Sequence, residues 1–421
     1  MRDALSLQRS SRWSGETTAS RGRKVTFIDR SLAEGFQRWL RPGRLRLELW
    51  DGSSSWPSDT ASVGDVVVAD RWALVKLIVD PDLQFGELYT QGRVTLRGQL
   101  EEIMEAASFL PRPDGLSLRE WIALHVTRRN GLTTSRRNVH HHYDLGNDFY
   151  KLWLDRQLVY TCALFPDADT TLEEAQIAKL DLVCRKLQLK PDETVIEAGC
   201  GWGALALHMA QAYGARVKAF NISREQVRFA RERAAAEGLS DRVEFIEDDY
   251  RKVTGRFDVF VSVGMLEHVG RHHYDSLSAV IRRVLNPTTG RGLLHFIGRD
   301  RPRPLNAWTA HRIFPGAYPP TAGEVLRQVL EPARQSIHHF ENLRLHYART
   351  LTHWRRRFER SEQEVRSQFG DAFYRAWHLY LASSEAAFAT GSLQLFQIVF
   401  APDGRVPLYA AQPFPEAADI P

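Results

Sequence analysis

The sequence predicts an α/β protein whose main domain is a doubly wound parallel sheet, with a smaller N-terminal α+β domain and helical insertions. Two observations carry this prediction. Between 194 and 297, short apolar segments alternate with helical stretches, which is typical of a parallel sheet covered by helices. The first segment, Thr194–Ile196, leads into the glycine-rich turn Glu197–Ala204, which opens a helix over Leu205–Ala210. Such a strand, turn and helix form a nucleotide-binding corner.

Residues 25–112 are predicted to form the small α+β domain. Arg44–Trp50 alternates polar and apolar residues as a half-buried strand does, and Ser62–Ala69 is a second strand candidate. Helices are predicted over Arg71–Val79 and Leu100–Ala107. Residues 1–24 are rich in Ser and Arg and lack an apolar core segment, so we expect a disordered tail, or as the minor alternative an organelle transit segment.

Residues 113–190 are predicted to be a helical connector that contributes to the active site, and residues 191–405 the main domain. Ligands of such sheets bind at the carboxyl ends of the strands. A largely helical insertion is expected over Glu324–Ser392, a last strand over Leu395–Phe400, and a tail over 406–421. The five predicted parallel strands are Thr194–Ile196, Arg216–Phe220, Val243–Ile246, Phe257–Val263 and Gly292–Ile297.

The composition is that of an ordinary globular protein. Of 421 residues, 43% are hydrophobic and 25% charged. The net charge of +5 suits an anionic surface or a merely solvated one, and no nucleic-acid-binding motif accompanies it. No run reaches the roughly 18 apolar residues of a spanning helix. Three cysteines, Cys162, Cys184 and Cys200, are an odd and sparse set that favours a reducing compartment over a disulfide framework.

The glycine spacing indicates which nucleotide the corner would bind. Gly199, Gly201 and Gly203 give G-x-G-x-G, whereas a dinucleotide fingerprint reads G-x-G-x-x-G. With the acid Glu197 before it, the shorter form resembles motif I of S-adenosylmethionine-dependent methyltransferases. A tight structural turn is the alternative interpretation.

Four further segments make the resemblance specific. They are His141–Tyr150, Leu158–Phe165, Gly264–Gly270 and Phe314–Gly316. In this order, with the glycine turn, they resemble the cyclopropane-fatty-acyl-phospholipid synthase family, which includes the mycolic acid cyclopropane synthases. The resemblance covers residues from about 40 to about 400. It implies a Rossmann-like class I methyltransferase domain after a lipid-associated N-terminal domain.

The resemblance also implies a reaction. A cis double bond of a phospholipid acyl chain attacks the sulfonium methyl group of S-adenosylmethionine, bound bicarbonate removes a proton from the carbocation, and a cyclopropane ring closes. A weak π nucleophile needs close positioning and exclusion of water more than a strong base. The implied partner is an unsaturated phospholipid at a membrane surface. The implied location is cytoplasmic, peripherally associated with the inner face of the membrane. A homodimer is suggested too, although no coiled-coil seam supports one.

The family's bicarbonate positions match Cys162, Glu267, His295, Ile297 and Tyr347. Backbone N–H groups near Cys162 and Ile297, with His295 and the Tyr347 hydroxyl, would hold the anion. Glu267 would accept a hydrogen bond from its hydroxyl and orient it. Singly, Cys162 is as well interpreted as a small buried hydrophobe, His295 as a satisfied core histidine and Glu267 as a helix cap.

The resemblance assigns ten cofactor positions. Tyr160 and Thr161 would contact the methionine moiety, the turn would lie beneath it, and Asp249 and Tyr250 would contact adenine. A ribose contact is expected after the second strand. Family members more often carry Asp at 197, Ser at 161 and Thr at 221. The ten positions are Tyr160, Thr161, Glu197, Gly199, Cys200, Gly201, Asn221, Gln226, Asp249 and Tyr250.

Two other features receive mainly structural interpretations. Neither His140–His142 nor the pair His268 and His272 has a clear third ligand, so no metal is expected. The basic stretch Trp354–Arg360 either faces lipid phosphates, with Trp354 and Phe358 at the interface, or is a solvated helix face.

Three alternative functions stay open. The same carbocation could lose a different proton and give a methylene or methyl branch. A family relative could methylate the nitrogen of a small amine. A chain that kept only the fold could bind lipid without catalysis.

Overall fold

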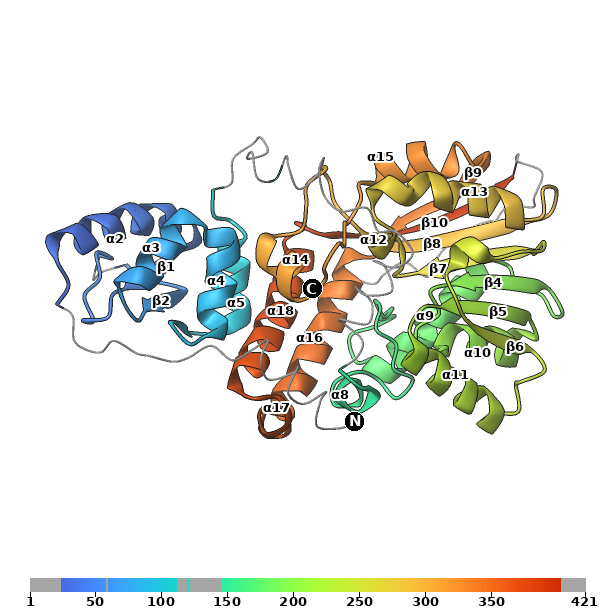
Figure 1. The fold of residues 1–421 in the computed structure, drawn as a ribbon, viewed down its shortest axis with the longest axis horizontal. Coiled ribbons are helices and arrows are strands. Elements are labelled where there is room, and N and C mark those ends of the chain that lie inside the picture. Colours follow the sequence, from blue (N-terminus) through green and yellow to red (C-terminus); the bar gives the residue numbers. More distant parts are fainter. Residues whose placement is uncertain (1–23, 58–59, 112–119, 121–144, 403–421) are drawn as a thin grey trace. The chain divides into compact units, whose positions relative to one another are not determined.

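The computed structural model describes residues 24–57, 60–111, 120 and 145–402 of the chain (Figure 1). The described residues form two compact units. The N-terminal unit combines the residues up to 120 with Leu305–Pro315 and Leu351–Ser392, and the remaining residues form the sheet unit. The border between the units therefore falls within one long helix, α16 (Arg344–Arg360).

The sheet unit is built on seven strands in the order β6-β5-β4-β7-β8-β10-β9. The five strands from β6 to β8 are parallel, and β10 runs antiparallel to both β8 and β9. The strand order reverses at β4, which has β5 on one side and β7 on the other, so this is the switch point where ligands bind. The strands are β4 Thr194–Ala198, β5 Arg216–Asn221, β6 Val243–Glu247, β7 Val259–Val263, β8 Arg291–Gly298, β9 Gln335–Asn342 and β10 Gln394–Pro402.

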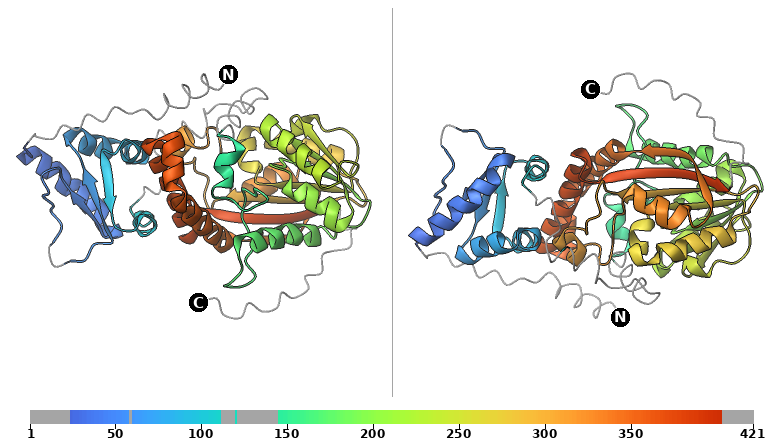
Figure 2. Two further views of the ribbon diagram at one scale, coloured as in Figure 1. Left: turned by 90° about the horizontal axis from the view of Figure 1, so that it is seen from below. Right: turned by 90° about the horizontal axis from the view of Figure 1, so that it is seen from above.

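Helices cover both faces of this sheet, as Figure 1 and Figure 2 show. On one face lie α9 (Leu172–Lys186), α10 (Ala204–Tyr213) and α11 (Arg224–Ala236); on the other lie α13 (Tyr274–Val284) and α15 (Ala322–Val325), which continues as a π-helical turn. The predicted fold class, a doubly wound α/β sheet, is confirmed.

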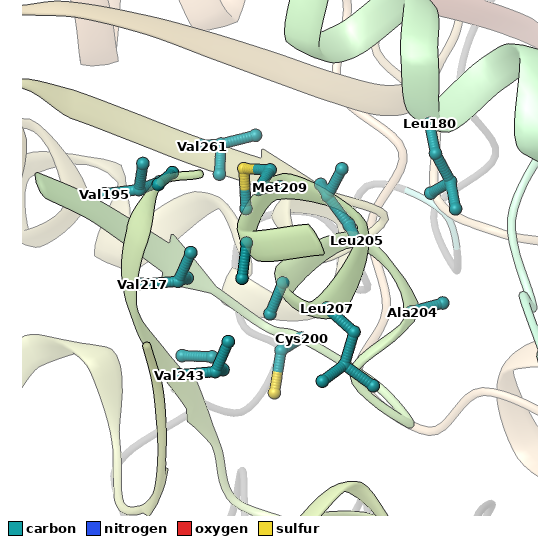
Figure 3. Packing of buried hydrophobic residues seen from close by; sticks show 14 of the residues in the cluster. Leu180, Val195, Cys200, Ala204, Leu205, Leu207, Met209, Val217, Val243 and Val261 are labelled. Carbon is teal, nitrogen blue, oxygen red and sulfur yellow. The ribbon is translucent and has the colours of Figure 1, made fainter. Parts of the chain in front are cut away.

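Each central strand is apolar on both sides because each of its faces meets helices. In β4, Val195 belongs to the core under α9–α11 and Ile196 to the core under α13. Figure 3 shows Val195 in this first core together with Leu205 and Met209 of α10. This two-sided burial explains why the strands read as continuous apolar runs.

The N-terminal unit has a small three-stranded sheet in the order β1-β2-β3, with β1 and β2 parallel and β3 antiparallel to β2. Side-chain caps set its helix starts: Asp70 accepts hydrogen bonds from two backbone N–H groups of α3, and Asp80 caps α4, which begins with Pro81. The elements are α2 Phe27–Leu40, β1 Leu45–Glu48, β2 Gly64–Val68, α3 Arg71–Val79, α4 Pro81–Thr90, β3 Val94–Arg97, α5 Leu100–Ala107, α14 Ala307–Arg312, α17 Glu362–Phe369 and α18 Asp371–Ala389.

Most predicted elements occur within a few residues of their expected bounds. No element was predicted for α2, α4, β3 or α14, and the largely helical segment predicted after Glu324 contains the strand β9. The predicted domain boundaries counted this helical segment within the main domain, whereas the contacts group Leu351–Ser392 with the N-terminal unit. Much of the predicted connector, including His140–His142, lies outside the described residues.

The prediction that Trp354 and Phe358 lie at a lipid interface is wrong, whereas Arg356 and Arg360 of the same stretch are exposed. Trp354 and Phe358 have 0% exposure, because this side of α16 packs into the N-terminal unit. The buried guanidinium of Arg355 lies among three carboxylates, 3.0 Å from Glu101, 2.7 Å from Glu359 and 2.7 Å from Glu385. A cationic residue on the buried side of this helix therefore joins α5, α16 and α18.

Arg355→Met should destabilise the N-terminal unit by about 2 kcal/mol, less than for a fully buried pair because two of the three carboxylates keep some water access. Amide hydrogen exchange in α5 and α18 would measure the loss. Arg356→Met is the control, because Arg356 is the next residue of the same helix and its side chain is exposed. Equal exchange in the two variants would contradict a structural role for Arg355.

Candidate active site

The glycine turn between β4 and α10 is tied to β5 and packed closely. The N–H groups of Gly199 and Cys200 donate to the carbonyl oxygen of Phe220 at 2.9 and 3.2 Å. Gly199 has a φ of +87°, and a Cβ there would lie 2.9 Å from the Cβ of Met265. A Cβ at Gly201 would meet no protein atom within 4 Å, so the middle of the turn borders open space. The backbone is thus available to a ligand at this point.

A cavity of about 170 Å³ opens over this turn at the carboxyl ends of β4, β5 and β7. We call it the glycine-turn cavity. All ten residues predicted to bind the cofactor line it. Further lining residues that the sequence reasoning did not single out include Lys179, Trp202, Arg251 and Met265.

Polar side chains at and after the carboxyl ends of β5 and β6 are oriented by hydrogen bonds within the protein. The Asn221 Nδ2 donates to Gln226 Oε1 at 2.8 Å and to the Gly201 carbonyl at 3.1 Å. The Asp249 carboxylate accepts hydrogen bonds from Arg251 on both oxygens, each at 2.7 Å. The Tyr250 hydroxyl is buried and has no hydrogen-bond partner among the described residues.

Two of the residues that line the cavity carry a buried carboxyl group and a buried amine. Burial raises the pKa of Glu197 to about 8, against the opposing effect of Lys179, and one of its oxygens has no partner among the described residues. Burial also lowers the pKa of Lys179 to about 8; its Nζ donates to the Thr161 hydroxyl at 3.0 Å. An unpartnered carboxylate oxygen at a cavity wall suits a ligand that carries positive charge. Lys179 was missed because a lysine in a helix normally faces water.

Aromatic rings form another wall of the cavity. Tyr160 and Trp202 line it, and the ring of Tyr150 packs behind both, with centroids 5.6 and 4.9 Å away. The Trp202 Nε1 donates to Asn147 at 2.8 Å, which fixes the indole. The part of the segment His141–Tyr150 that the structure describes thus supports the wall.

Three of the five predicted anion-binding residues are joined at β8. Glu267 Oε1 accepts a hydrogen bond from the backbone N–H of Ile297, and Glu267 Oε2 is buried without a partner among the described residues. His295, two residues before Ile297, lies on the same face of β8; its Nδ1 is 2.8 Å from Gln397 Nε2, while its own Nε2 is buried and unpartnered in the described part of the chain.

Burial shifts the pKa values of both Glu267 and His295. The pKa of the Glu267 carboxyl is raised to about 7, and that of the His295 imidazole is lowered well below its usual range. The N–H of Ile297 is already engaged by Glu267, so this residue positions Glu267 rather than offering a free donor.

Cys162 and Tyr347 both approach the carbonyl group of Leu343, which directly precedes α16. The Cys162 Sγ lies 3.9 Å from the carbonyl oxygen of Leu343, to which the Tyr347 N–H donates at 3.2 Å. Leu343 in turn donates to Leu395, which pairs with Ile297 in the sheet. Burial raises the pKa of the Cys162 thiol well above its usual value, so the side chain is a thiol and not a thiolate.

The predicted anion-binding residues do not line the glycine-turn cavity, but two of them are sequence neighbours of residues that do. Cys162 follows the lining residue Thr161, and Glu267 precedes the lining residue His268. Within the described residues, no three His, Cys, Asp or Glu side chains gather to hold a metal ion. All three cysteines are free and buried.

Comparison with known proteins places these features in a family. A model of the mycolic acid cyclopropane synthetase family matches residues 130–398. A probable fatty acid methyltransferase from Pseudomonas putida is 33% identical over 366 residues, which are 84% of this chain and 91% of the relative. The cyclopropane-fatty-acyl-phospholipid synthase of Escherichia coli K12 is 42% identical over 266 residues, 62% of this chain and 66% of that protein.

Solved structures agree. The cyclopropane synthase MmaA2 from Mycobacterium tuberculosis has 31% identity and a TM-score of 0.59, covering 63% of this chain and 98% of that one. The mycolic acid cyclopropane synthase CmaA1, complexed with SAH and CTAB, has 28% identity and a TM-score of 0.60, covering 63% and 97%. The unpartnered Glu197 oxygen fits the positive charge of S-adenosylmethionine. This chain therefore belongs to the mycolic acid cyclopropane synthetase family and is an S-adenosylmethionine-dependent methyltransferase.

Proposed function

We propose that the protein alkylates the double bond of an unsaturated phospholipid acyl chain and forms a cyclopropane ring there. The observation that carries the proposal is two buried polar atoms with no partner among the described residues, Glu267 Oε2 and His295 Nε2. Both residues neighbour residues that line the glycine-turn cavity: Glu267 precedes His268, and His295 pairs with Val263 in the sheet. Buried polar groups are nearly always satisfied, so an unpartnered acceptor and an unpartnered imidazole nitrogen support a ligand of mixed donor and acceptor character. Bicarbonate has that character.

When bound, S-adenosylmethionine supplies the methyl group, whose C–S bond breaks as the double bond takes it, and bicarbonate accepts the proton whose C–H electron pair then closes the ring. The chain's own residues bind and orient. Glu267, with Oε1 held by Ile297, presents Oε2 as an acceptor when ionised. His295 and the Tyr347 hydroxyl would complete the anion site, and the thiol of Cys162 would border it.

The walls of the cavity support the same chemistry by excluding water. Tyr160 and Trp202 present aromatic rings to the cavity. Aromatic faces attract cations, and they offer a carbocation no nucleophile that could trap it.

The N-terminal unit supports contact with a membrane surface. An ion pair between Arg71 and Asp29, with Nε to Oδ1 at 2.6 Å, joins the N-termini of α2 and α3. Next to these two residues, Phe27 is 83% exposed, Ile28 67% and Trp72 63%. Exposed apolar side chains beside a cationic one suit the interface of a phospholipid bilayer. None of the described helices is long and apolar enough to cross a membrane.

We infer a cytoplasmic enzyme that works peripherally at the inner face of the membrane. A homodimer remains a prediction from the resemblance alone. The relative from Pseudomonas putida, a probable fatty acid methyltransferase, favours a methyl or methylene branch as the second candidate product. Mass spectrometry and NMR of the product acyl chains distinguish a ring from a branch.

Glu267→Gln should lower lipid alkylation at least about a hundredfold, because it removes the acceptor that orients the proton-accepting anion. The assay combines purified protein, unsaturated phospholipid vesicles, bicarbonate and methyl-labelled S-adenosylmethionine, with label counted on the acyl chains. Binding of the methyl donor should be unchanged. Glu244→Gln, at an exposed position of β6, is the control. Near-normal turnover by Glu267→Gln would refute the role.

Glu267→Gln should also stabilise the protein at high pH. Burial raises the folded-state pKa from 4.5 to about 7, so wild-type stability is greatest below the unfolded value and falls as pH rises through about 7. Glutamine does not ionise, so the variant keeps the roughly 3 kcal/mol of unfolding free energy that the wild type loses. Urea unfolding in buffers without added bicarbonate, from about pH 5 to about pH 8, should show the gain growing and then levelling. A gain independent of pH would contradict a buried Glu267 carboxyl.

The double variant Phe27→Ser, Trp72→Ser should bind anionic phospholipid vesicles at least about tenfold more weakly. Two apolar side chains would no longer insert into the bilayer, and this loss exceeds the roughly 1.4 kcal/mol that corresponds to a tenfold change. Vesicle sedimentation measures it. Ile177→Ser, at an exposed apolar position of α9 in the sheet unit, is the matched control. If both variants bind like wild type, α2 and α3 do not form the membrane contact.

A further inference from the structure

A row of buried polar side chains leads from the edge of the sheet to His295. In the sheet register, Gln397 of β10 lies between His295 of β8 and Glu341 of β9. From α9, the ammonium of Lys186 contacts the Glu341 carboxylate and donates to Gln397 Oε1 at 2.7 Å. Gln397 Nε2 is 2.8 Å from His295 Nδ1. The side chain of Glu341 is 25% exposed, whereas those of Lys186 and Gln397 are fully buried.

The chemistry of these groups sets the direction of every hydrogen bond in the row. An ammonium group can only donate, so the oxygen of the Gln397 amide must face Lys186 and its NH₂ must face His295. The amide therefore donates to His295 Nδ1, which must be the unprotonated nitrogen. A neutral imidazole carries one N–H, and here that proton lies on Nε2. The low pKa of the buried His295 favours the neutral form.

We propose that Lys186 and Gln397 are positioning residues that hold His295 as the neutral tautomer protonated on Nε2, so that it donates to the reaction's anion and does not act as a base. The donation to an anion rests on the proposed function; the tautomer rests on the row alone. Nε2 is the nitrogen with no partner among the described residues. A donor at this point complements the acceptor that Glu267 Oε2 provides.

The burial of Lys186 argues against a merely structural row. An ammonium group loses its hydration when buried, and an apolar residue of similar size usually serves packing as well or better. Burial lowers the pKa of Lys186, while the contact with Glu341 opposes that shift. The ion pair thus keeps a charged ammonium group inside the sheet unit. There it donates to Gln397 Oε1 and so fixes the orientation of the amide.

Nitrogen NMR of histidine-labelled protein reads the tautomer directly. The His295 signals are those that disappear in His295→Asn. In wild type we expect a protonated Nε2 and a bare Nδ1. Gln397→Glu offers an acceptor to both neighbours, so the proton should move to Nδ1. Alkylation should then fall at least about tenfold, with a raised KM for bicarbonate, as for other residues that orient a ligand-binding histidine.

Gln394→Glu is the matched control, because Gln394 is a buried glutamine of the same strand that bonds Asn342 instead. It should leave the tautomer and the KM for bicarbonate unchanged. Gln397→Met and Lys186→Met serve if a carboxylate at 397 prevents folding. In either variant, His295 should populate both tautomers, because nothing then orients a donor at Nδ1.

Three results would overturn the inference. The first is a wild-type His295 protonated on Nδ1. The second is a tautomer that stays unchanged in every variant of Gln397 and Lys186. The third is a variant of Gln397 or Lys186 in which the tautomer changes but the KM for bicarbonate stays equal to that of the control Gln394→Glu. Failure of the proposed function looks different. Wild type would then show the expected tautomer but transfer no label to lipid, or transfer it without bicarbonate, which removes the donation to the anion and leaves the tautomer assignment standing.

Discussion

The structure depends on how polar groups are buried at the carboxyl ends of the parallel strands. Both faces of this sheet are covered by helices, so side chains at the ends of β4, β7 and β8 have little water around them. Glu197, Glu267 and His295 are each left with an atom that has no partner among the described residues. Burial then decides their protonation: it keeps both carboxyls protonated to unusually high pH and the imidazole neutral. The site is therefore poised for ligands that bring the missing partners.

Two buried charged side chains outside the site have ion-pair partners within the chain. Arg355 meets three carboxylates within the N-terminal unit, and Asp29 is held by Arg71 and by its own helix cap. Both thus have ion-pair partners, whereas Glu197, Glu267 and His295 each keep one atom without a partner among the described residues. Unsatisfied buried atoms also occur away from the site, as at Arg46, His208 and Trp308. Such atoms therefore support a site only together with a cavity and perturbed pKa values.

Much of the fold and one part of the site followed from the sequence. Alternating apolar strands and helices indicated the doubly wound sheet, and the glycine turn indicated the cavity, which all ten expected residues line. Other features depend on contacts between distant residues. Lys179 and Lys186 look like surface lysines of α9 until the fold buries them, and Gln397 reads as an ordinary strand residue. The placement of Trp354 at a lipid interface failed because composition shows that a helix is basic but not which of its sides other helices cover. The strand β9 was missed because its polar residues, such as Gln335 and Asn342, lie at an exposed sheet edge where apolar alternation is weak.

The position of β10 has a consequence for synthesis of the chain. It is the last of the described strands in sequence, yet it lies between β8 and β9, which are made earlier. Until residues 394–402 emerge from the ribosome, β8 presents an unpaired backbone edge rich in leucine and phenylalanine, and His295 has no Gln397 beside it. An apolar edge of this kind can pair with other nascent chains. Insertion of β10 therefore covers this edge, and the same event completes the surroundings of the histidine.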